Sequence, residues 1–206
     1  MAKVELYIAQ SYRSRAFIEL LQNADDAGAR RFLIRQVGDV LIVANDGRTF
    51  SNEDVIALCR SGASNKQRGR GTIGYRGIGF KSVAGVAREI DVISGGSSFR
   101  FSKEITQKLL KIESDVPLIR IPHPVNADKL RSAALAESLL SEGMNTVFVL
   151  FGLNERMVAD EAANLDEIAM LFLNNVSQVQ IDLRGVKRKL NRIASLRDDG
   201  FSVEQI

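Results

Sequence analysis

Apolar and polar residues follow two different periods along this chain, and each period predicts a different kind of element. Between residues 12 and 27, apolar side chains recur every three or four positions, which predicts an amphipathic helix that ends at Gly28. Shorter apolar runs bounded by glycine, asparagine or proline predict strands. The first two such runs, 31–37 and 40–45, turn at Gly38 and predict a hairpin.

The rest of the chain continues this mixture. Because helices and strands are interspersed and several strands follow one another as hairpins, the pattern predicts an α+β fold with one mixed sheet covered by helices on one face. The stretch 104–115 fits either kind of element. The remaining expected helices are 51–60, 78–86, 127–141 and 164–174, and the remaining expected strands are 88–94, 98–102, 117–121, 145–152 and 178–183.

Length and composition fit one main domain. A chain of 206 residues with 45% hydrophobic residues can bury one sizeable core. We expect residues 1–189 to form that domain, and residues 190–206 to be a linker or the start of a following domain.

The first helix carries three polar residues, Glu19, Asn23 and Asp26, on one face, because residues three or four apart stack along a helix. Such a stripe is most often a solvated surface. Asn23 and Asp26 are nevertheless poor helix formers, and a merely solvated face would more often carry Glu, Lys or Arg. An amide oxygen such as that of Asn23 suits Mg²⁺, which keeps several waters and takes few protein ligands. Glu19, one turn away, is placed to act as a general base on a water molecule.

A glycine-rich stretch is the second unusual feature. Five glycines fall between residues 69 and 79 among basic side chains, and a helix is expected to begin near Gly77 or Ile78. Glycine lets the backbone approach a ligand closely, and the start of a helix favours phosphate. Lys81 and Ser82 can add a charge and a donor. A flexible loop has the same composition, and the stretch matches neither the Walker nor the Rossmann glycine pattern.

Together the segments Glu19–Gly28 and Ile73–Val83 resemble the Bergerat-fold ATP-binding domain of the GHKL superfamily, which DNA gyrase, the ninety-kilodalton heat-shock chaperones, histidine kinases and MutL proteins share. Within this superfamily, the sequences of the two segments most resemble the sacsin-like branch. The resemblance covers residues 10–185. It implies a two-layer α/β sandwich that binds ATP or ADP with Mg²⁺.

The resemblance also implies residue roles. Glu19 corresponds to the catalytic base and Asn23 to the Mg²⁺ ligand, and Asp26 shares their face of the helix. Residues 61–73 resemble the mobile lid that closes over the nucleotide in this superfamily. The candidates for the phosphate-binding turn and its flanks are Gly74, Arg76, Gly77, Ile78, Gly79, Phe80 and Lys81.

The adenine-binding motif of the family, Asp-x-Gly-x-Gly after a strand, is matched only in part. Aligning the motif on Gly47 places Asn45 at the adenine position, and Thr49 replaces the second glycine. An Asn can still accept a hydrogen bond from the amino group of adenine but lacks the charge, so Asn45 and Asp46 are both candidates. By itself Asn-Asp-Gly is typical of an ordinary tight turn. Thr146, in a late strand, resembles the Thr that helps hold the adenine-binding side chain.

Charge and cysteine content bear on the expected partners and compartment of the protein. The net charge of +3 is slight, and the only basic cluster, 184–192, is more typical of a solvated face than of a nucleic-acid site. The single cysteine, Cys59, excludes an internal disulfide and is expected to be buried in a helix. The single histidine, His123, lies between two prolines and is expected in a turn. Without a signal peptide or an apolar run long enough to span a bilayer, we expect a cytoplasmic protein with no membrane contact.

The function expected from the sequence is slow, Mg²⁺-dependent ATP hydrolysis that drives conformational switching or dimerisation. Such a domain would serve a chaperone-like or a defence- or DNA-associated multidomain protein, with a second copy or later domains as partners. A histidine-kinase phosphotransferase is disfavoured because no helix with a phosphoacceptor histidine precedes the domain. A degenerate interaction module of the same fold, which has lost its nucleotide, is the alternative from another class.

Overall fold

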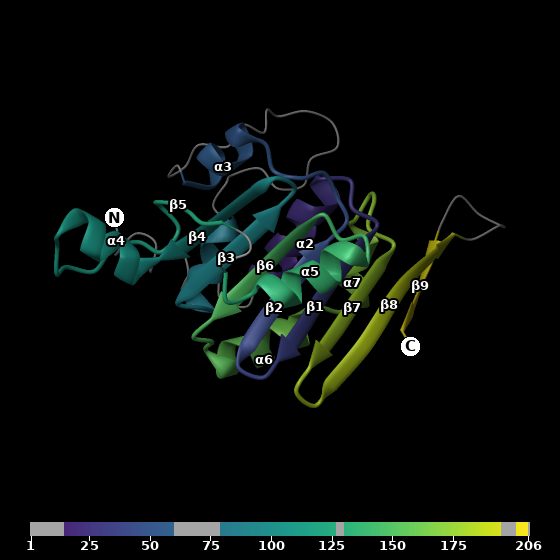
Figure 1. Ribbon diagram of the computed structural model, residues 1–206. Helices are drawn as coiled ribbons and strands as arrows, with labels where there is room; N and C mark the ends of the chain where they lie inside the picture. The colour runs from purple at the N-terminus through teal and green to yellow at the C-terminus, as the bar shows by residue number, and fades with distance from the viewer. Residues whose placement is uncertain (1–14, 60–78, 127–129, 195–200, 206) are drawn as a thin grey trace.

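The computed structural model describes residues 15–59, 79–126, 130–194 and 201–205. Within these ranges one nine-stranded sheet runs through the molecule in the order β5-β4-β3-β6-β2-β1-β7-β8-β9 (Figure 1). Neighbouring strands are antiparallel, except that β1 and β7 are parallel. The strands are β1 Arg31–Val37, β2 Val40–Asn45, β3 Glu89–Ser94, β4 Ser97–Ser102, β5 His123–Pro124, β6 Thr146–Phe151, β7 Gln178–Leu183, β8 Val186–Ala194 and β9 Phe201–Gln205.

Helices cover both faces of this sheet unequally. In Figure 1, α5 crosses in front of β6, β2 and β1, whereas α2 lies behind them. Side chains from α2, η1, α6 and α7 join one core cluster on the rear face, and α5 belongs to the cluster on the front face. The helices are α2 Ala16–Asp26, α3 Asn52–Cys59, the 3₁₀ helix η1 Gly79–Gly85, α4 Lys103–Leu110, α5 Ala133–Ser141, α6 Glu155–Asn164 and α7 Glu167–Leu171.

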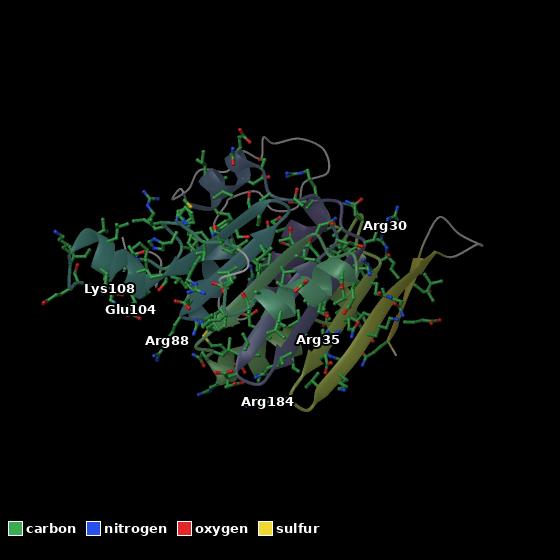
Figure 2. All side chains as sticks on the ribbon, viewed as in Figure 1. Arg30, Arg35, Arg88, Glu104, Lys108 and Arg184 are labelled. Atoms are coloured by element: carbon green, nitrogen blue, oxygen red, sulfur yellow. The ribbon has the colours of Figure 1, made fainter. Side chains whose placement is uncertain are left out.

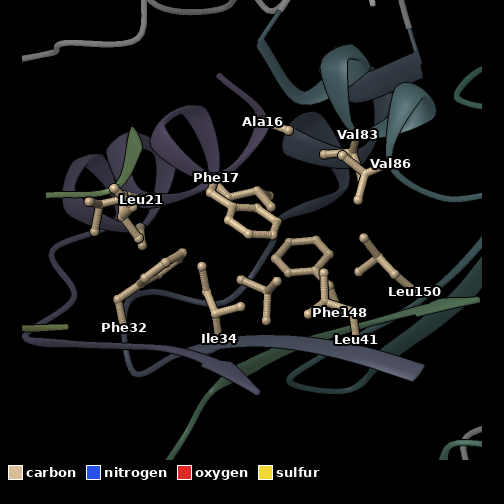
Figure 3. Close-up of a cluster of buried hydrophobic side chains, with 14 of the residues drawn as sticks. Ala16, Phe17, Leu21, Phe32, Ile34, Leu41, Val83, Val86, Phe148 and Leu150 are labelled. Carbon is tan, nitrogen blue, oxygen red and sulfur yellow. The ribbon is translucent and has the colours of Figure 1, made fainter. Parts of the chain in front are cut away.

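The larger core lies between α2, η1 and the sheet (Figure 3). Phe17 of α2 is 0% exposed and stands over the strands that carry Ile34 and Phe148. In β1, β2, β3 and β6, alternate residues point at this core and the residues between them point at the smaller core under α5. Full burial of a side chain such as Phe17 stabilises the fold by about 1.5–3 kcal/mol.

The fold class predicted from the sequence is confirmed: the structure is α+β, with a mixed and mostly antiparallel sheet. The helices were expected on one face only, but α5 covers the face opposite α2. Three expected strands, 31–37, 40–45 and 178–183, match β1, β2 and β7 residue for residue. The expected strand at 145–152 is β6, and the expected helix at 51–60 is α3.

Other expectations about elements were wrong. Residues 117–121 form no strand although Leu118 and Ile119 are buried, because burial alone does not place a segment beside a sheet edge. The expected helix at 164–174 is shorter and is preceded by α6, which the sequence pattern missed. The apolar stripe of α6 is interrupted by Glu161, a buried carboxylate where an apolar residue would normally stand. The ambiguous stretch 104–115 contains most of α4.

The C-terminal strands extend the sheet beyond the expected core. The boundary expected after residue 189 falls inside β8, and Leu190 of that strand is fully buried. β9 then pairs with β8 and forms the last strand in the sheet order. None of the described helices is both long and apolar enough to cross a lipid bilayer.

Candidate functional site

The candidate residues of α2 lie where its buried side meets the surface. Glu19, Asn23 and Asp26 are each half-buried, whereas the neighbouring Leu20 and Ala24 are buried in the core. Their spacing of four and three residues places the three polar side chains along one side of the helix. The structure therefore places two carboxylates and one carboxamide in a row beside the core.

The segment η1 packs directly against α2. Figure 3 shows Ala16 and Phe17 of α2 next to Val83 and Val86, and the two helices are in contact. Gly79 starts η1, and the next three residues, Phe80, Lys81 and Ser82, are all buried. The expected helix at 78–86 is thus a short 3₁₀ helix, which has a tighter turn than an α-helix. Four of the glycine-rich candidates, Gly74, Arg76, Gly77 and Ile78, lie outside the described residues, as does the expected lid at 61–73.

The face of the sheet that α2 and η1 cover is called the helix-covered face, and a polar row crosses three strands at one end of it. In the strand registers Asn45 stands opposite Thr146, and Thr146 stands opposite Ser94, so all three side chains point to the same face. The Oγ atoms of Ser94 and Thr146 are 2.6 Å apart, and the Ser94 hydroxyl accepts a hydrogen bond from the backbone N–H of Phe50 at 2.9 Å. Thr146 is thereby held next to Asn45.

Asn45 turns its side chain back onto the loop that follows it. Its Oδ1 accepts a hydrogen bond from the backbone N–H of Gly47 at 3.1 Å, and the residue is only 6% exposed. This is the local bond by which an Asn closes a turn. A carbonyl oxygen has a second lone pair, so Oδ1 can accept one more hydrogen bond.

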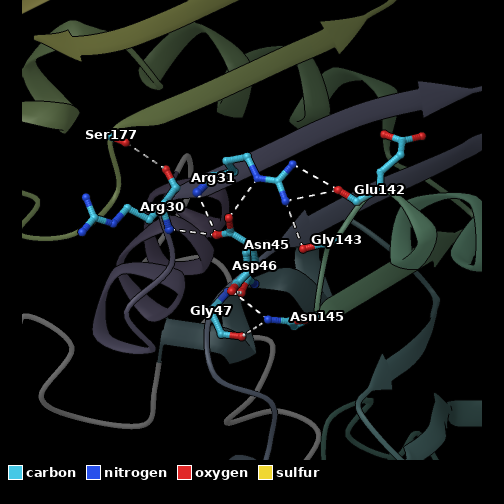
Figure 4. Close-up of polar contacts among 9 residues, drawn as sticks. All are labelled: Arg30, Arg31, Asn45, Asp46, Gly47, Glu142, Gly143, Asn145 and Ser177. Carbon is cyan, nitrogen blue, oxygen red and sulfur yellow. Dashed lines mark hydrogen bonds and ion pairs between the residues drawn. The ribbon is translucent and has the colours of Figure 1, made fainter.

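The carboxylate of Asp46 binds the start of β1 (Figure 4). Its Oδ1 accepts hydrogen bonds from the backbone N–H groups of Arg30 and Arg31, both at 2.8 Å, and its Oδ2 pairs with Nε of Arg31 at 2.9 Å. The guanidinium of Arg31 also donates to the carbonyl oxygens of Glu142 and Gly143. Burial tends to raise the pKa of Asp46, but these bonds from Arg31 and Arg30 outweigh it and hold the pKa below its usual value. The carboxylate therefore has a structural partner set of its own.

Gly47 brings this turn against the end of α2. A Cβ atom at this position would lie 3.0 Å from Cβ of Ala27 and 3.1 Å from its carbonyl oxygen. The backbone N–H of Arg48 donates to that same oxygen at 2.8 Å. From the other side, Nδ2 of Asn145 donates to the carbonyl oxygens of Asp46 and Gly47. Glycine fits this close approach, whereas a side chain at this position would force Ala27 to shift.

Aromatic rings connect the turn with η1. The ring centroids of Phe50 and Phe148 are 6.0 Å apart, and those of Phe80 and Phe148 are 5.5 Å apart. Phe148 follows Thr146 on the same face of β6. The loop after the Asn-Asp-Gly turn and the start of η1 therefore meet over one strand.

Basic and thiol groups gather beside the start of η1. Lys81 is 5% exposed, and Nη1 of Arg120 donates to the carbonyl oxygen of Cys59 at 2.7 Å. Burial raises the pKa of the Cys59 thiol, and the charges of Lys81 and Arg120 act in the opposite direction. The expectation that Cys59 lies in a helix is confirmed, although the residue is only partly buried.

No group of three or more His, Cys, Asp or Glu side chains that could hold a metal ion is found in the part of the chain that the structure describes. The oxygen-bearing side chains of α2 fit Mg²⁺ in their chemistry, since that ion is often held by one or two protein oxygens and completed by phosphates and water. The only candidate protein ligand in this row that is not acidic is Asn23.

The structure also assigns roles that the sequence did not reveal. Asp25, next to Asp26, is 0% exposed, and its carboxylate accepts hydrogen bonds from the backbone N–H groups of Asn174, Asn175 and Val176. The only signal in the sequence was a pair of adjacent aspartates near a helix end. Ser94 had no signal beyond its place at the end of a strand.

The basic cluster at 184–192 is divided by the alternation of β8. Arg188 and Arg192 turn to the helix-covered face and donate to the carbonyl oxygens of Ala162, Leu173 and Asn174. Lys187 and the nearby Arg184 are exposed. Charged side chains are spread around the molecule in Figure 2, from Glu104 on α4 to Arg184 before β8.

Comparison with known proteins finds a relative in a plant. The chain is 31% identical over 175 residues to the Protein NO VEIN of Arabidopsis thaliana. The aligned region is 82% of this chain but only 6% of that protein, so the chain corresponds to a small part of its relative. No family model matches the chain.

Proposed function

We propose that this chain is an ATP-binding domain of the Bergerat type that hydrolyses ATP slowly with the help of Mg²⁺. The observation that carries the proposal is the convergence of three separate segments on one end of the helix-covered face. These are α2, the turn at 45–47 with Thr146, and the start of η1. The N–H of Arg48 after the turn binds the end of α2, η1 packs against α2, and Phe80 of η1 contacts Phe148, two residues after Thr146. Their order along the chain is the order of the motifs in the GHKL superfamily.

Of the two candidates for adenine recognition, Asn45 is the better placed. Its side chain lies on the helix-covered face beside Thr146, whereas the carboxylate of Asp46 is bound to Arg30 and Arg31. The amino group of adenine is a donor, and Oδ1 of Asn45 retains one acceptor site. The bond between Ser94 and Thr146 then keeps the strand end rigid beneath the base.

On α2, Glu19 would be the general base that takes the proton of the attacking water, and Asn23 would offer its amide oxygen to Mg²⁺. When bound, the ion would neutralise charge on the phosphate oxygens. The resemblance assigns the phosphates to the glycine-rich segment that precedes Phe80, and Lys81 follows that segment in the sequence. Phosphoryl transfer depends mostly on positioning and charge stabilisation, and a stabilising cation often comes from another domain or subunit. Turnover by this domain alone is therefore feeble, and a second copy or a later domain is the partner that completes the site.

The similarity to NO VEIN supports membership of a larger multidomain protein, because the chain matches only 6% of that relative. The resemblance of the motif sequences to the sacsin-like branch also supports membership of a larger protein. The proposal makes the domain a nucleotide-controlled switch within such a protein.

The test is isothermal titration calorimetry with a non-hydrolysable ATP analogue and Mg²⁺, followed by single-turnover hydrolysis of ATP. We expect the wild type to bind the analogue, Asn45→Ala to weaken binding about tenfold or more, and Glu19→Ala to bind normally but lose hydrolysis. Asp46→Asn is the matched control for Asn45→Ala, and its affinity should change little. Absence of any binding heat in the wild type would favour a protein-interaction module instead. Unchanged hydrolysis in Glu19→Ala would refute the role of Glu19.

A further inference from the structure

Both ends of α2 are held by fully buried carboxylates. At its start, the backbone N–H of Phe17 donates to Oε2 of Glu161 at 3.0 Å, and Glu161 is 1% exposed. At its end, Asp25 binds three backbone N–H groups that begin at Asn174. The two partners lie in one stretch of chain, 161–176, which runs from α6 through α7 to the segment before β7. A single stretch of chain therefore forms hydrogen bonds with both ends of α2.

The contact at the start of α2 is the one that the helix itself cannot make. The first N–H groups of a helix have no partner within it, and the residue at the N-cap position, Arg15, provides no side-chain bond. The carboxylate of Glu161 replaces the missing cap across 144 residues of sequence and also complements the positive end of the helix dipole.

Glu161 stands at a position where an apolar residue would be the ordinary choice. Its neighbours on the inner side of α6, Val158 and Ala162, are buried, and Oε1 makes no hydrogen bond among the described residues. Burial raises the pKa of Glu161, while the N–H groups at the start of α2, including that of Phe17, partly oppose this effect. Asp160 on α6 adds to the rise, and Arg188 on β8 donates to the adjacent Ala162 carbonyl. Retaining a carboxylate here costs stability that a leucine would not cost.

The proposed chemistry of α2 lies between these two contacts. Glu19 is two residues after Phe17, and Asn23 is two residues before Asp25, so each is about 3 Å along the axis from a held position. The first intrahelical hydrogen bond, from the N–H of Glu19 to the carbonyl oxygen of Arg15, forms next to the Glu161 cap. A shift at the capped end would therefore move Glu19 more than Asn23.

We propose that Glu161 is a positioning residue, which acts through the start of α2 to set where the carboxylate of Glu19 stands relative to the attacking water. This inference rests on the proposed ATPase function. Glu161 therefore affects the rate of hydrolysis through the start of α2. The contacts of Asp25 are separate and hold the other end of the helix, near Asn23.

The experiment compares Glu161→Leu with Glu161→Gln in single-turnover ATP hydrolysis and in calorimetric binding of a non-hydrolysable ATP analogue with Mg²⁺. Leucine fills the site but cannot accept a hydrogen bond, whereas glutamine keeps one acceptor oxygen. We expect Glu161→Leu to lower the rate about tenfold or more while the Kd changes less than about threefold, because a misplaced general base costs rate before it costs affinity. Glu161→Gln should recover most of the rate.

The control is Arg156→Gln, which removes an exposed charge from the same helix and should leave both quantities unchanged. All variants are compared below their unfolding transitions, which circular dichroism monitors. A normal rate in folded Glu161→Leu would overturn the proposal. So would a parallel loss of rate and affinity, which would indicate a general loosening of the fold.

A second measurement separates this proposal from the proposed function. Amide hydrogen exchange without nucleotide should become faster at Glu19 and its neighbours in Glu161→Leu, and remain unchanged near Ala27 at the other end of α2. If the wild type binds no ATP, the proposed function fails, and the exchange result still decides whether Glu161 holds the helix. If amide exchange at Glu19 and its neighbours were as slow in Glu161→Leu as in the wild type, the positioning role would be overturned.

Discussion

The sharpest stability test concerns Asp25, whose carboxylate joins the end of α2 to the segment before β7. Oδ1 accepts the backbone N–H groups of Asn175 and Val176 at 2.7 and 2.8 Å, and Oδ2 accepts that of Asn174 at 2.9 Å. The residue is 0% exposed, so water cannot replace these bonds. Asp25→Asn changes one oxygen into an NH₂ group with almost no change in volume.

The expected magnitude follows from these contacts. In its better orientation the substituted asparagine side chain keeps one oxygen on two donors and turns its NH₂ group toward the N–H of Asn174. One buried donor left without an acceptor costs about 1–3 kcal/mol, and the two remaining bonds lose their charge assistance. We therefore expect Asp25→Asn to lower the free energy of unfolding by about 2–4 kcal/mol, which is a large fraction of the total for one domain.

The assay is equilibrium unfolding in urea followed by far-ultraviolet circular dichroism, because the chain has no tryptophan to report by fluorescence. The m value should stay constant while the midpoint falls. Asp39→Asn, in the exposed turn between β1 and β2, is the control and should change the free energy by less than about 0.5 kcal/mol. If Asp25→Asn were as stable as this control, the three hydrogen bonds would not hold the end of α2.

Two further predictions address the turn at 45–47. Gly47→Ala should destabilise the protein by about 1–3 kcal/mol because its Cβ would press on the backbone of Ala27, whereas Gly96→Ala, where the added atom meets nothing within 4 Å, should be nearly neutral; equal urea midpoints for the two variants would contradict the close approach. The lowered pKa of Asp46 means that its ionised form stabilises the folded state above the pKa of the unfolded chain, at about 4, and that this contribution disappears as the pH falls through the lower, folded pKa. The difference in unfolding free energy between the wild type and Asp46→Asn should therefore be larger at pH 7 than at about pH 3, and a pH-independent difference would refute the assignment.

Local patterns were sufficient for much of the fold. The strands β1, β2 and β7 and the helix α2 are bounded by turn residues and carry a clear period, so neighbouring residues alone decide their conformation. The sequence pattern did not predict α6, because Glu161 interrupts its apolar stripe. That residue instead binds the start of α2, a helix far away in the sequence. The stretch 117–121 was wrongly predicted as a strand, because its apolar residues are buried but do not pair with the sheet.

The sequence by itself determined which kinds of side chain gather on α2, at the Asn-Asp-Gly turn and in the glycine-rich stretch, because helical spacing and turn chemistry are local. It could not distinguish Asn45 from Asp46, or Asp25 from Asp26. Only the tertiary structure separates these neighbours by their contacts. Strand register turned Asn45 toward Thr146, and hydrogen bonds from Arg31 and from Asn175 bound Asp46 and Asp25. These partners are remote in sequence, and a buried carboxylate is stable only where the fold brings donors to it.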